Sequence, residues 1–205
     1  MTDRAELAGT ILLAVAAVAT AWCSYQANRW NGEQAKQSGT TNRIRLEAVR
    51  AQGLAEAQQE IDVATFVQWI DAYALDRDEL VDFYFRRFRA EFKPAVVAWL
   101  ATKPRTNPNA PLTPFAMPQY KLAASAEADR LDAEAAVSSD LVHRNIQRSA
   151  NYVLGVVMFA VALFLAGMSM KLRSPRLRVA LLVCGYVVFL TTIAWIATFP
   201  VKTGI

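Results

Sequence analysis

The sequence predicts an all-α membrane protein with three transmembrane helices and a helical, hairpin-like extramembrane domain between spans one and two. Residues of the AVILMFWYC group make up 54% of the 205-residue chain. No Asp, Glu, Lys, Arg or His occurs in three windows of 22 or 23 residues, Leu7–Asn28, Ser149–Met170 and Val179–Val201. A helix needs roughly 20 apolar residues to cross a hydrocarbon core of about 30 Å. Each window is therefore long enough to be a span.

These windows divide the chain into an N-terminal transmembrane helix at 1–28, an extramembrane domain at 29–148 and a C-terminal transmembrane hairpin at 149–205. A cleaved signal peptide is the alternative for the first window, because Ala19-Thr20-Ala21 fits the small-residue cleavage pattern. Signal peptides prefer a positively charged start, whereas the leading segment MTDRAE carries two acids and one base. We expect an uncleaved anchor.

The extramembrane domain is predicted to contain helices on both sides of a proline-rich loop. The segment from Trp22 to Gln59 has no proline and is rich in good helix formers, so span one should continue into the domain. The segment 76–93, DRDELVDFYFRRFRAEFK, has acids early and bases late, which suits a helix dipole and predicts one helix capped by Asp76 or Asp78. Its Phe residues are expected in the domain core rather than on a membrane surface.

The loop itself comprises residues 104–118 and holds five of the eight prolines, which excludes long regular elements. After it, the segment from Gln119 to Ala150 lacks Gly and Pro and is rich in Ala. This segment predicts a second long helix that continues into span two.

The charges predict the orientation. The short loop between spans two and three carries four bases and no acid: Lys171, Arg173, Arg176 and Arg178. Short Lys- and Arg-rich loops stay cytoplasmic, so the N-terminus is expected inside and residues 29–148 in the periplasm or outside the cell. The domain has 16 bases and 16 acids and does not oppose this orientation, although one diagnostic loop leaves the inverted topology open.

Span one has two contrasting faces. Thr10, Ala14, Ala17, Ala21 and Ser24 follow helical spacing on a small-residue face. Small residues allow close helix contacts, so this face is predicted either to pack against spans two and three or to line an oligomer contact or pore. Aromatic residues concentrate where membrane meets water, so interface anchors are expected at Trp22, Tyr25 and Trp30.

No motif for catalysis, nucleotide binding or metal binding is present. The single histidine, His143, lies on a polar helical segment and is expected to be solvated. The spans lack the ionisable residues that proton relays and ion-coupled transporters need. No basic stripe indicates nucleic-acid binding, and Cys23 and Cys184 fall inside spans, where packing explains them. We expect no cofactor and no enzyme activity, and a membrane-embedded enzyme is the least favoured function.

A short pattern at the end of span one, Thr20-Ala21-Trp22 followed by Tyr25-Gln26-Ala27, resembles uncharacterised bacterial inner-membrane proteins of a domain-of-unknown-function type. The plan of one N-terminal span, a helical domain and a C-terminal hairpin is similar too. The resemblance covers fewer than ten residues. It implies a bacterial inner membrane and transfers no activity and no site.

Two functions are therefore expected. In both, the spans of the protein contact membrane lipids. The first is a non-enzymatic inner-membrane protein that forms a homo-oligomer, with a passive channel or pore as one outcome. Three spans cannot enclose a wide channel alone, so a pore would need several copies in a closed ring. The second is a membrane-anchored scaffold or sensor that binds an unknown protein partner through its extramembrane tip.

Overall fold

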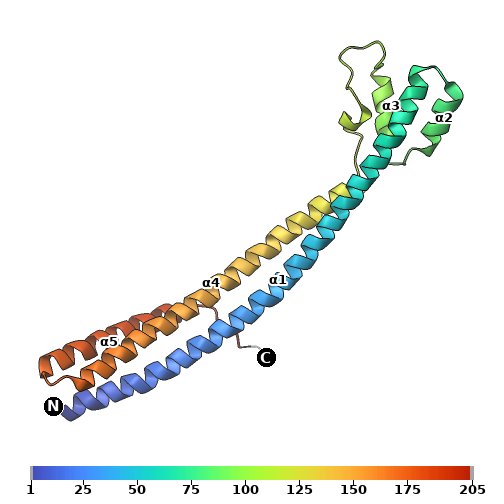
Figure 1. Ribbon diagram of the computed structural model, residues 1–205. Coiled ribbons are helices and arrows are strands. Elements are labelled where there is room, and N and C mark those ends of the chain that lie inside the picture. The colour runs from blue at the N-terminus through green and yellow to red at the C-terminus, as the bar shows by residue number, and fades with distance from the viewer. Residues whose placement is uncertain (1, 204–205) are drawn as a thin grey trace. The chain divides into compact units, whose positions relative to one another are not determined.

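The computed structural model describes residues 2–203, with side chains from Glu6 onward, and its secondary structure is entirely helical within that range (Figure 1). Asp3 and Arg4, which enter the signal-peptide argument, therefore lie outside the described side chains. The elements are five α-helices and one 3-10 turn: α1 (Thr2–Ala74), α2 (Asp78–Arg87), α3 (Lys93–Ala101), η1 (Pro114–Ala116), α4 (Ala123–Lys171) and α5 (Pro175–Ile196). The predicted all-α class is confirmed.

The chain forms two compact units, and the two longest helices contribute to both. We call Met1–Thr40 with Val137–Ile205 the spanning unit, and Thr41–Ala136 the helical unit. α1 is a single helix from span one to its end in the helical unit, as the proline-free sequence predicts. α4 likewise runs without a break into span two.

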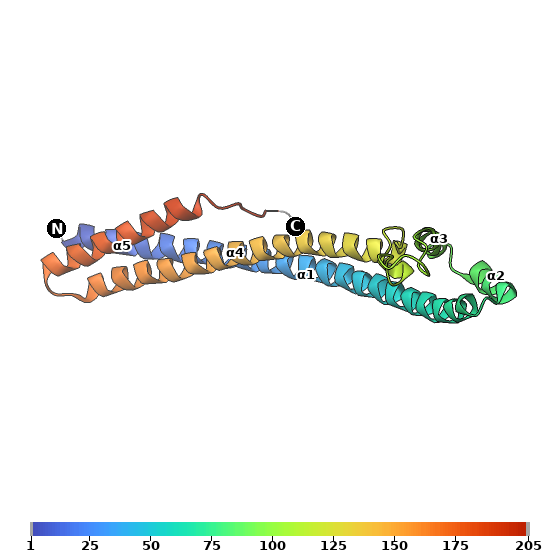
Figure 2. The same cartoon turned by 90° about the horizontal axis from the view of Figure 1, so that it is seen from above.

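The spanning unit contains the three helices that are long and apolar enough to cross a membrane, α1, α4 and α5. They lie side by side in both views (Figures 1 and 2). Three such helices make the chain a multi-pass membrane protein.

Small residues allow these three helices to approach closely. Leu12 and Ala16 of α1 are buried with Ala162 of α4 and Phe189 of α5. Each helix also contributes a glycine at a contact. A Cβ at Gly185 of α5 would lie 3.4 Å from Leu12 Cδ2 and 3.5 Å from the Ala162 carbonyl oxygen. Close backbone approach at small residues is the usual way in which membrane helices pack.

Hydrogen bonds join the helices at both ends of the spanning unit. At one end, the Tyr186 hydroxyl of α5 donates to the Ala8 carbonyl of α1 at 2.9 Å, and Arg178 lies 3.8 Å from Glu6. At the other end, the Ser149 hydroxyl of α4 donates to the Ala27 carbonyl at 3.1 Å. The start of α1 and the loop before α5 therefore belong to the same end.

The segment after α5 packs against α1 at the opposite end. The Lys202 amide donates to Gln26 Oε1 at 3.1 Å, and the Lys202 ammonium binds Glu33 at 2.5 Å. Gln26 is fully buried although it lies near the end of span one. The backbone of this segment therefore supplies the partner that a buried amide needs.

In the helical unit, α1 and α4 pack through Ile44 and Ala48 against Leu131 and Ala135. The sequence places these residues at helical spacing on one face of each segment, as two packed helices require. Alanine brings the two backbones close together because it has no bulk beyond Cβ.

The prediction of one helix over 76–93, capped by Asp76 or Asp78, is wrong in both the length of the helix and its N-cap residue. α2 ends at Arg87, and Phe88 has an extended backbone with φ −58° and ψ 144°. Phe88 and Phe92 of the connection that follows α2 are both buried in the core of the helical unit. The N-cap position is Arg77, without a side-chain cap, whereas Asp76 has a positive φ of 53° and binds Arg105 instead. Pro94 lies in the first turn of α3, as expected of a proline that starts a helix.

Candidate functional site

An aromatic cluster forms the core of the helical unit. Its buried members come from the last turns of α1, the α2–α3 connection and α3: Phe66, Trp69, Phe88, Phe92, Ala95, Val96 and Trp99. The rings meet mostly edge to face, as Phe66 does with Trp99 at a centroid distance of 5.7 Å. Such pairs add to the free energy gained by burial alone.

The proline-rich loop is folded onto this cluster. The Trp99 indole N–H donates to the Pro111 carbonyl at 2.6 Å. Phe115, in η1, stacks on Phe92 at 5.0 Å. The loop therefore has a defined path, although its sequence excludes a long helix or strand.

A buried polar network lies beside the aromatic cluster. Asp62 of α1 is fully buried, and its Oδ2 accepts hydrogen bonds from Arg89 at 2.8 Å and from the Tyr120 hydroxyl at 3.1 Å. Arg89 also donates to Glu91, whose second oxygen accepts from the Ala123 amide at 3.2 Å. The network thus joins α1, the α2–α3 connection and the first turn of α4.

Burial controls the protonation of this network. Desolvation raises the pKa of Asp62, while Arg89 and the Tyr120 hydroxyl act in the opposite direction. Desolvation and the neighbouring Asp62 carboxylate both raise the pKa of Tyr120, so its hydroxyl remains a hydrogen-bond donor. The arrangement is typical of a structural network, because the Asp62 carboxylate has a cation and a hydroxyl as partners.

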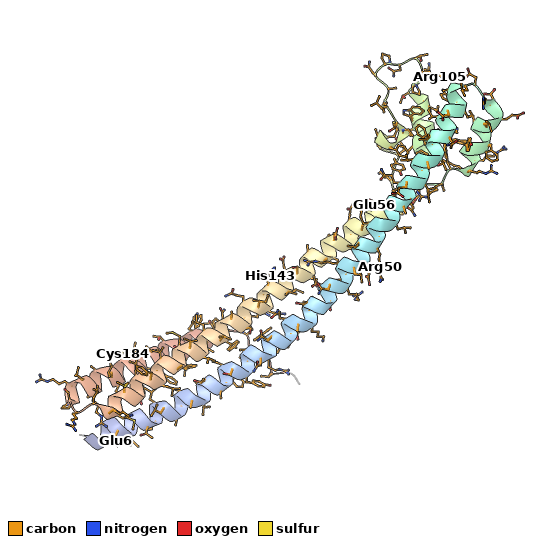
Figure 3. The ribbon with its side chains drawn as sticks, in the orientation of Figure 1. Glu6, Arg50, Glu56, Arg105, His143 and Cys184 are labelled. Carbon is orange, nitrogen blue, oxygen red and sulfur yellow. The ribbon has the colours of Figure 1, made fainter. Side chains whose placement is uncertain are left out.

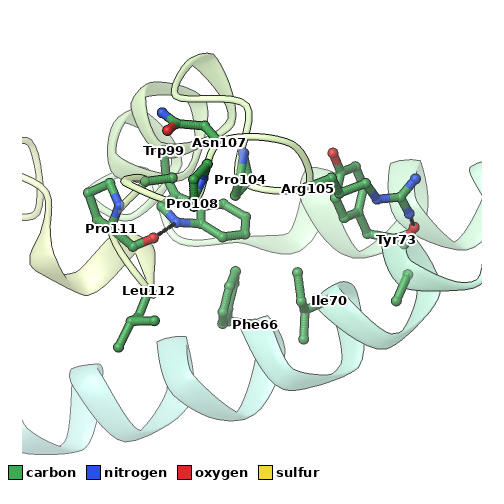
Figure 4. A pocket seen from close by; sticks show the side chains of 12 residues that line it. Phe66, Ile70, Tyr73, Trp99, Pro104, Arg105, Asn107, Pro108, Pro111 and Leu112 are labelled. Carbon is green, nitrogen blue, oxygen red and sulfur yellow. Dashed lines mark hydrogen bonds between the residues drawn. The ribbon is translucent and has the colours of Figure 1, made fainter.

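A pocket of about 380 Å³ opens between the end of α1, Trp99 and the proline-rich loop (Figure 4). α1 contributes Phe66, Ile70 and Tyr73 to one wall. The loop contributes the opposite wall, mainly through prolines: Pro104, Pro108, Pro111 and Leu112, with Arg105 and Asn107 at the edge. This volume lies within the range of roughly 300–1,000 Å³ that is typical of ligand sites.

The polar groups around the pocket are already engaged. The Arg105 guanidinium binds Asp76 at 2.8 Å, donates to the Tyr73 carbonyl and lies 4.1 Å from the centre of the Tyr73 ring. The Asn107 amide donates to the Thr102 carbonyl at 3.0 Å. The surface of the pocket that remains for a ligand is mostly apolar and aromatic. Such a surface suits an apolar side chain better than a charged metabolite.

The predicted small-residue face of span one lies away from the contacts within the chain. Thr10, Ala14, Ala17 and Ala21 are exposed and Ser24 is half-buried. The helix instead buries Leu12, Ala16, Cys23 and Ala27 against α4 and α5. The Thr10 hydroxyl donates to the Glu6 carbonyl of its own helix at 2.9 Å. The described residues of this face therefore do not pack against spans two and three, which is one of the two roles that the sequence predicts for it.

The three predicted interface anchors differ in their surroundings. Trp22 and Tyr25 are exposed and lie 5.9 Å apart, whereas Trp30 is buried beneath Arg148, whose guanidinium is 4.5 Å from the ring. Lys171, Arg173 and Arg176 are exposed at the α4–α5 connection, and Arg178 is half-buried near Glu6. His143 is exposed on α4, as predicted (Figure 3).

The pocket and the polar network are the features that the sequence does not reveal. Asp62 looks like any acid on a charged helix, and its partners Arg89 and Tyr120 are 27 and 58 residues away. One signal was available: Asp62 occupies the face of α1 that carries Phe66 and Trp69, so its carboxylate had to be buried with them.

Within the described residues, no group of three or more His, Cys, Asp or Glu side chains is arranged to hold a metal ion. No protein-family model matches the chain, and no curated protein or solved structure is significantly similar to it.

Proposed function

We propose that this protein is a membrane-anchored docking protein, whose helical unit binds an apolar side chain of a protein partner in the pocket beside Trp99. The observation that carries the proposal is Leu112. This leucine lines the pocket and is 94% exposed. A well-placed loop leucine with almost no contacts of its own supports a role in binding.

The walls of the pocket support a protein partner rather than a small polar ligand. Protein interfaces are anchored by aromatic pockets that receive one or two large side chains, surrounded by a rim that excludes water. Phe66, Tyr73 and Trp99 provide the aromatic part. Leu75 extends the exposed apolar surface next to the pocket residue Ala74.

Two matched leucine variants test this proposal. Leu112→Gln removes the exposed apolar group, while Leu54→Gln makes the same change on α1 at a residue that is also more than half exposed. Exposed substitutions of this kind change stability by about 0.5 kcal/mol or less. Quantitative proteomics of the protein purified from its own membranes should lose one partner in Leu112→Gln and retain it in Leu54→Gln. An identical set of co-purified proteins in both variants contradicts the proposal.

A second proposal is that the protein forms a homo-oligomer through the small-residue face of α1. Its support is that Thr10, Ala14, Ala17 and Ala21 are exposed while other residues of α1 pack against α4 and α5. A central channel, if the oligomer encloses one, would be lined by this face. Native mass spectrometry of the wild type and of Ala17→Leu tests it: several copies that dissociate in the variant support the contact, and a monomeric wild type contradicts both contact and channel.

The proposed location is a bacterial inner membrane, with the N-terminus and the α4–α5 connection in the cytoplasm and residues 29–148 outside. The support is the group of four bases at the α4–α5 connection and in the helix turns beside it. Labelling of Lys103→Cys in intact cells by a membrane-impermeant maleimide tests this orientation. Labelling only after cell lysis would favour the inverted topology.

A further inference from the structure

A second cavity lies in the spanning unit, between α1, α4 and α5, and has a volume of about 410 Å³. Nine residues line it, and none of them is an acidic or basic residue type: Val15, Val18, Ala19, Trp22, Cys23, Phe159, Ile193, Ile196 and Ala197. In a membrane, such a cavity faces hydrocarbon rather than water, because it lies within the windows that cross the apolar core. A hydrocarbon chain is the occupant that its chemistry fits.

A positive charge lies above this cavity on the same face of α1. Val15, Val18, Trp22, Tyr25 and Arg29 follow one another at helical spacings of three and four residues. Arg29 is thus the first charged residue on this face after the window without acids and bases ends at Asn28. A side chain at this depth lies at the level of lipid headgroups.

Arg29 is attracted by Glu33 but forms no hydrogen bond or close ion pair within the described part of the chain. Its side chain is half-buried, and its Nε atom is buried without a hydrogen-bond acceptor. Glu33, one turn further along α1, binds Lys202 at 2.5 Å instead. The rest of the guanidinium is partly exposed and can donate to an anionic group outside the chain.

We propose that these two features form a binding site for one anionic glycerophospholipid, with an acyl chain in the cavity and the phosphate at Arg29. The charge of Arg29 complements an anionic headgroup, because a guanidinium can donate two parallel hydrogen bonds to a phosphate. Trp22 lies between the two parts of the site, where an aromatic ring contacts the glycerol and upper acyl region.

Native mass spectrometry of the full-length protein tests the site, with phosphatidylglycerol and phosphatidylcholine of the same acyl chains as probes. The wild type should retain one phosphatidylglycerol per chain at concentrations at which phosphatidylcholine dissociates. Arg29→Gln should reduce the preference for phosphatidylglycerol over phosphatidylcholine about fivefold, as expected for the loss of one basic residue near the membrane surface. Arg50→Gln, the same change at an exposed arginine of α1, should keep it.

Filling the cavity tests the acyl-chain part separately. Ala19→Leu, or Ala197→Leu if the first variant folds poorly, should abolish retention of the single lipid. Ala160→Leu, at an exposed position of α4 that does not line the cavity, should have no effect. Equal retention of both lipids by the wild type, or unchanged retention in Arg29→Gln and in the folded cavity variant, would overturn the proposal.

Discussion

Arg89 donates a hydrogen bond of 2.8 Å to Asp62, a carboxylate whose side chain is entirely buried in the helical unit. Removing one partner from a buried ion pair leaves an uncompensated charge and costs about 3–5 kcal/mol. We expect Arg89→Gln to reduce the free energy of unfolding by that amount. Asp62→Asn should cost less, because no buried anion remains and Arg89 retains Glu91. Chemical denaturation of both variants in detergent measures this order, and the reverse order would contradict the assigned roles.

The pH dependence of this network follows from the raised pKa of Asp62. Because desolvation favours the protonated carboxyl in the folded state, Asp62 contributes most to stability below its ordinary pKa of 3.8. That contribution falls as the pH rises through the folded-state pKa. The stability of the wild type relative to Asp62→Asn should therefore be greater at pH 4 than at pH 7. Thermal unfolding of both proteins at the two pH values measures the difference, and a relative stability that grows with pH would be inconsistent with burial as the dominant cause.

Trp99 should determine the conformation of the proline-rich loop. Trp99→Phe keeps an aromatic ring in the core but removes the N–H that binds the Pro111 carbonyl. A lost hydrogen bond of this kind costs about 0.5–1.5 kcal/mol. We expect faster amide exchange at residues 105–113 and little change in α4. Hydrogen–deuterium exchange mass spectrometry provides the measurement, and unaltered exchange in the loop would show that other contacts hold it.

Two glycines of the spanning unit offer a matched test of its packing. A side chain at Gly185 meets Leu12 and the backbone of Ala162, whereas nothing lies within 4 Å of a Cβ at Gly167. Overfilling a packed contact costs about 1–3 kcal/mol. Gly185→Leu should therefore lower the melting temperature in detergent much more than Gly167→Leu. Equal effects of the two substitutions would mean that the three helices are not packed as described.

The sequence predicts the spans and the long helices because both signals are local. The charge-free windows predict the membrane spans. The proline-free, Ala-rich segments on either side of the loop predict the long helices α1 and α4. These features need no knowledge of distant residues.

The pocket and the polar network depend on contacts between distant residues, which local patterns do not report. The acids and bases of residues 76–93 predict one helix, but the backbone leaves helical geometry at Phe88 and α2 ends at Arg87. Likewise, the proline content correctly excludes long regular structure in the loop but does not reveal the bond from Trp99 that positions it. Tertiary packing overrides helix propensity at these positions.

Site-specific photo-crosslinking at the rim of the pocket tests the proposed docking function most directly. A photoreactive phenylalanine derivative replaces Leu112 in the full-length protein in its native membrane, and the same residue replaces Leu54 as a control. The proposal predicts one discrete crosslinked protein at position 112, absent at position 54 and lost when Ala110→Phe fills the pocket. No adduct at position 112, or the same adducts at both positions, would contradict it.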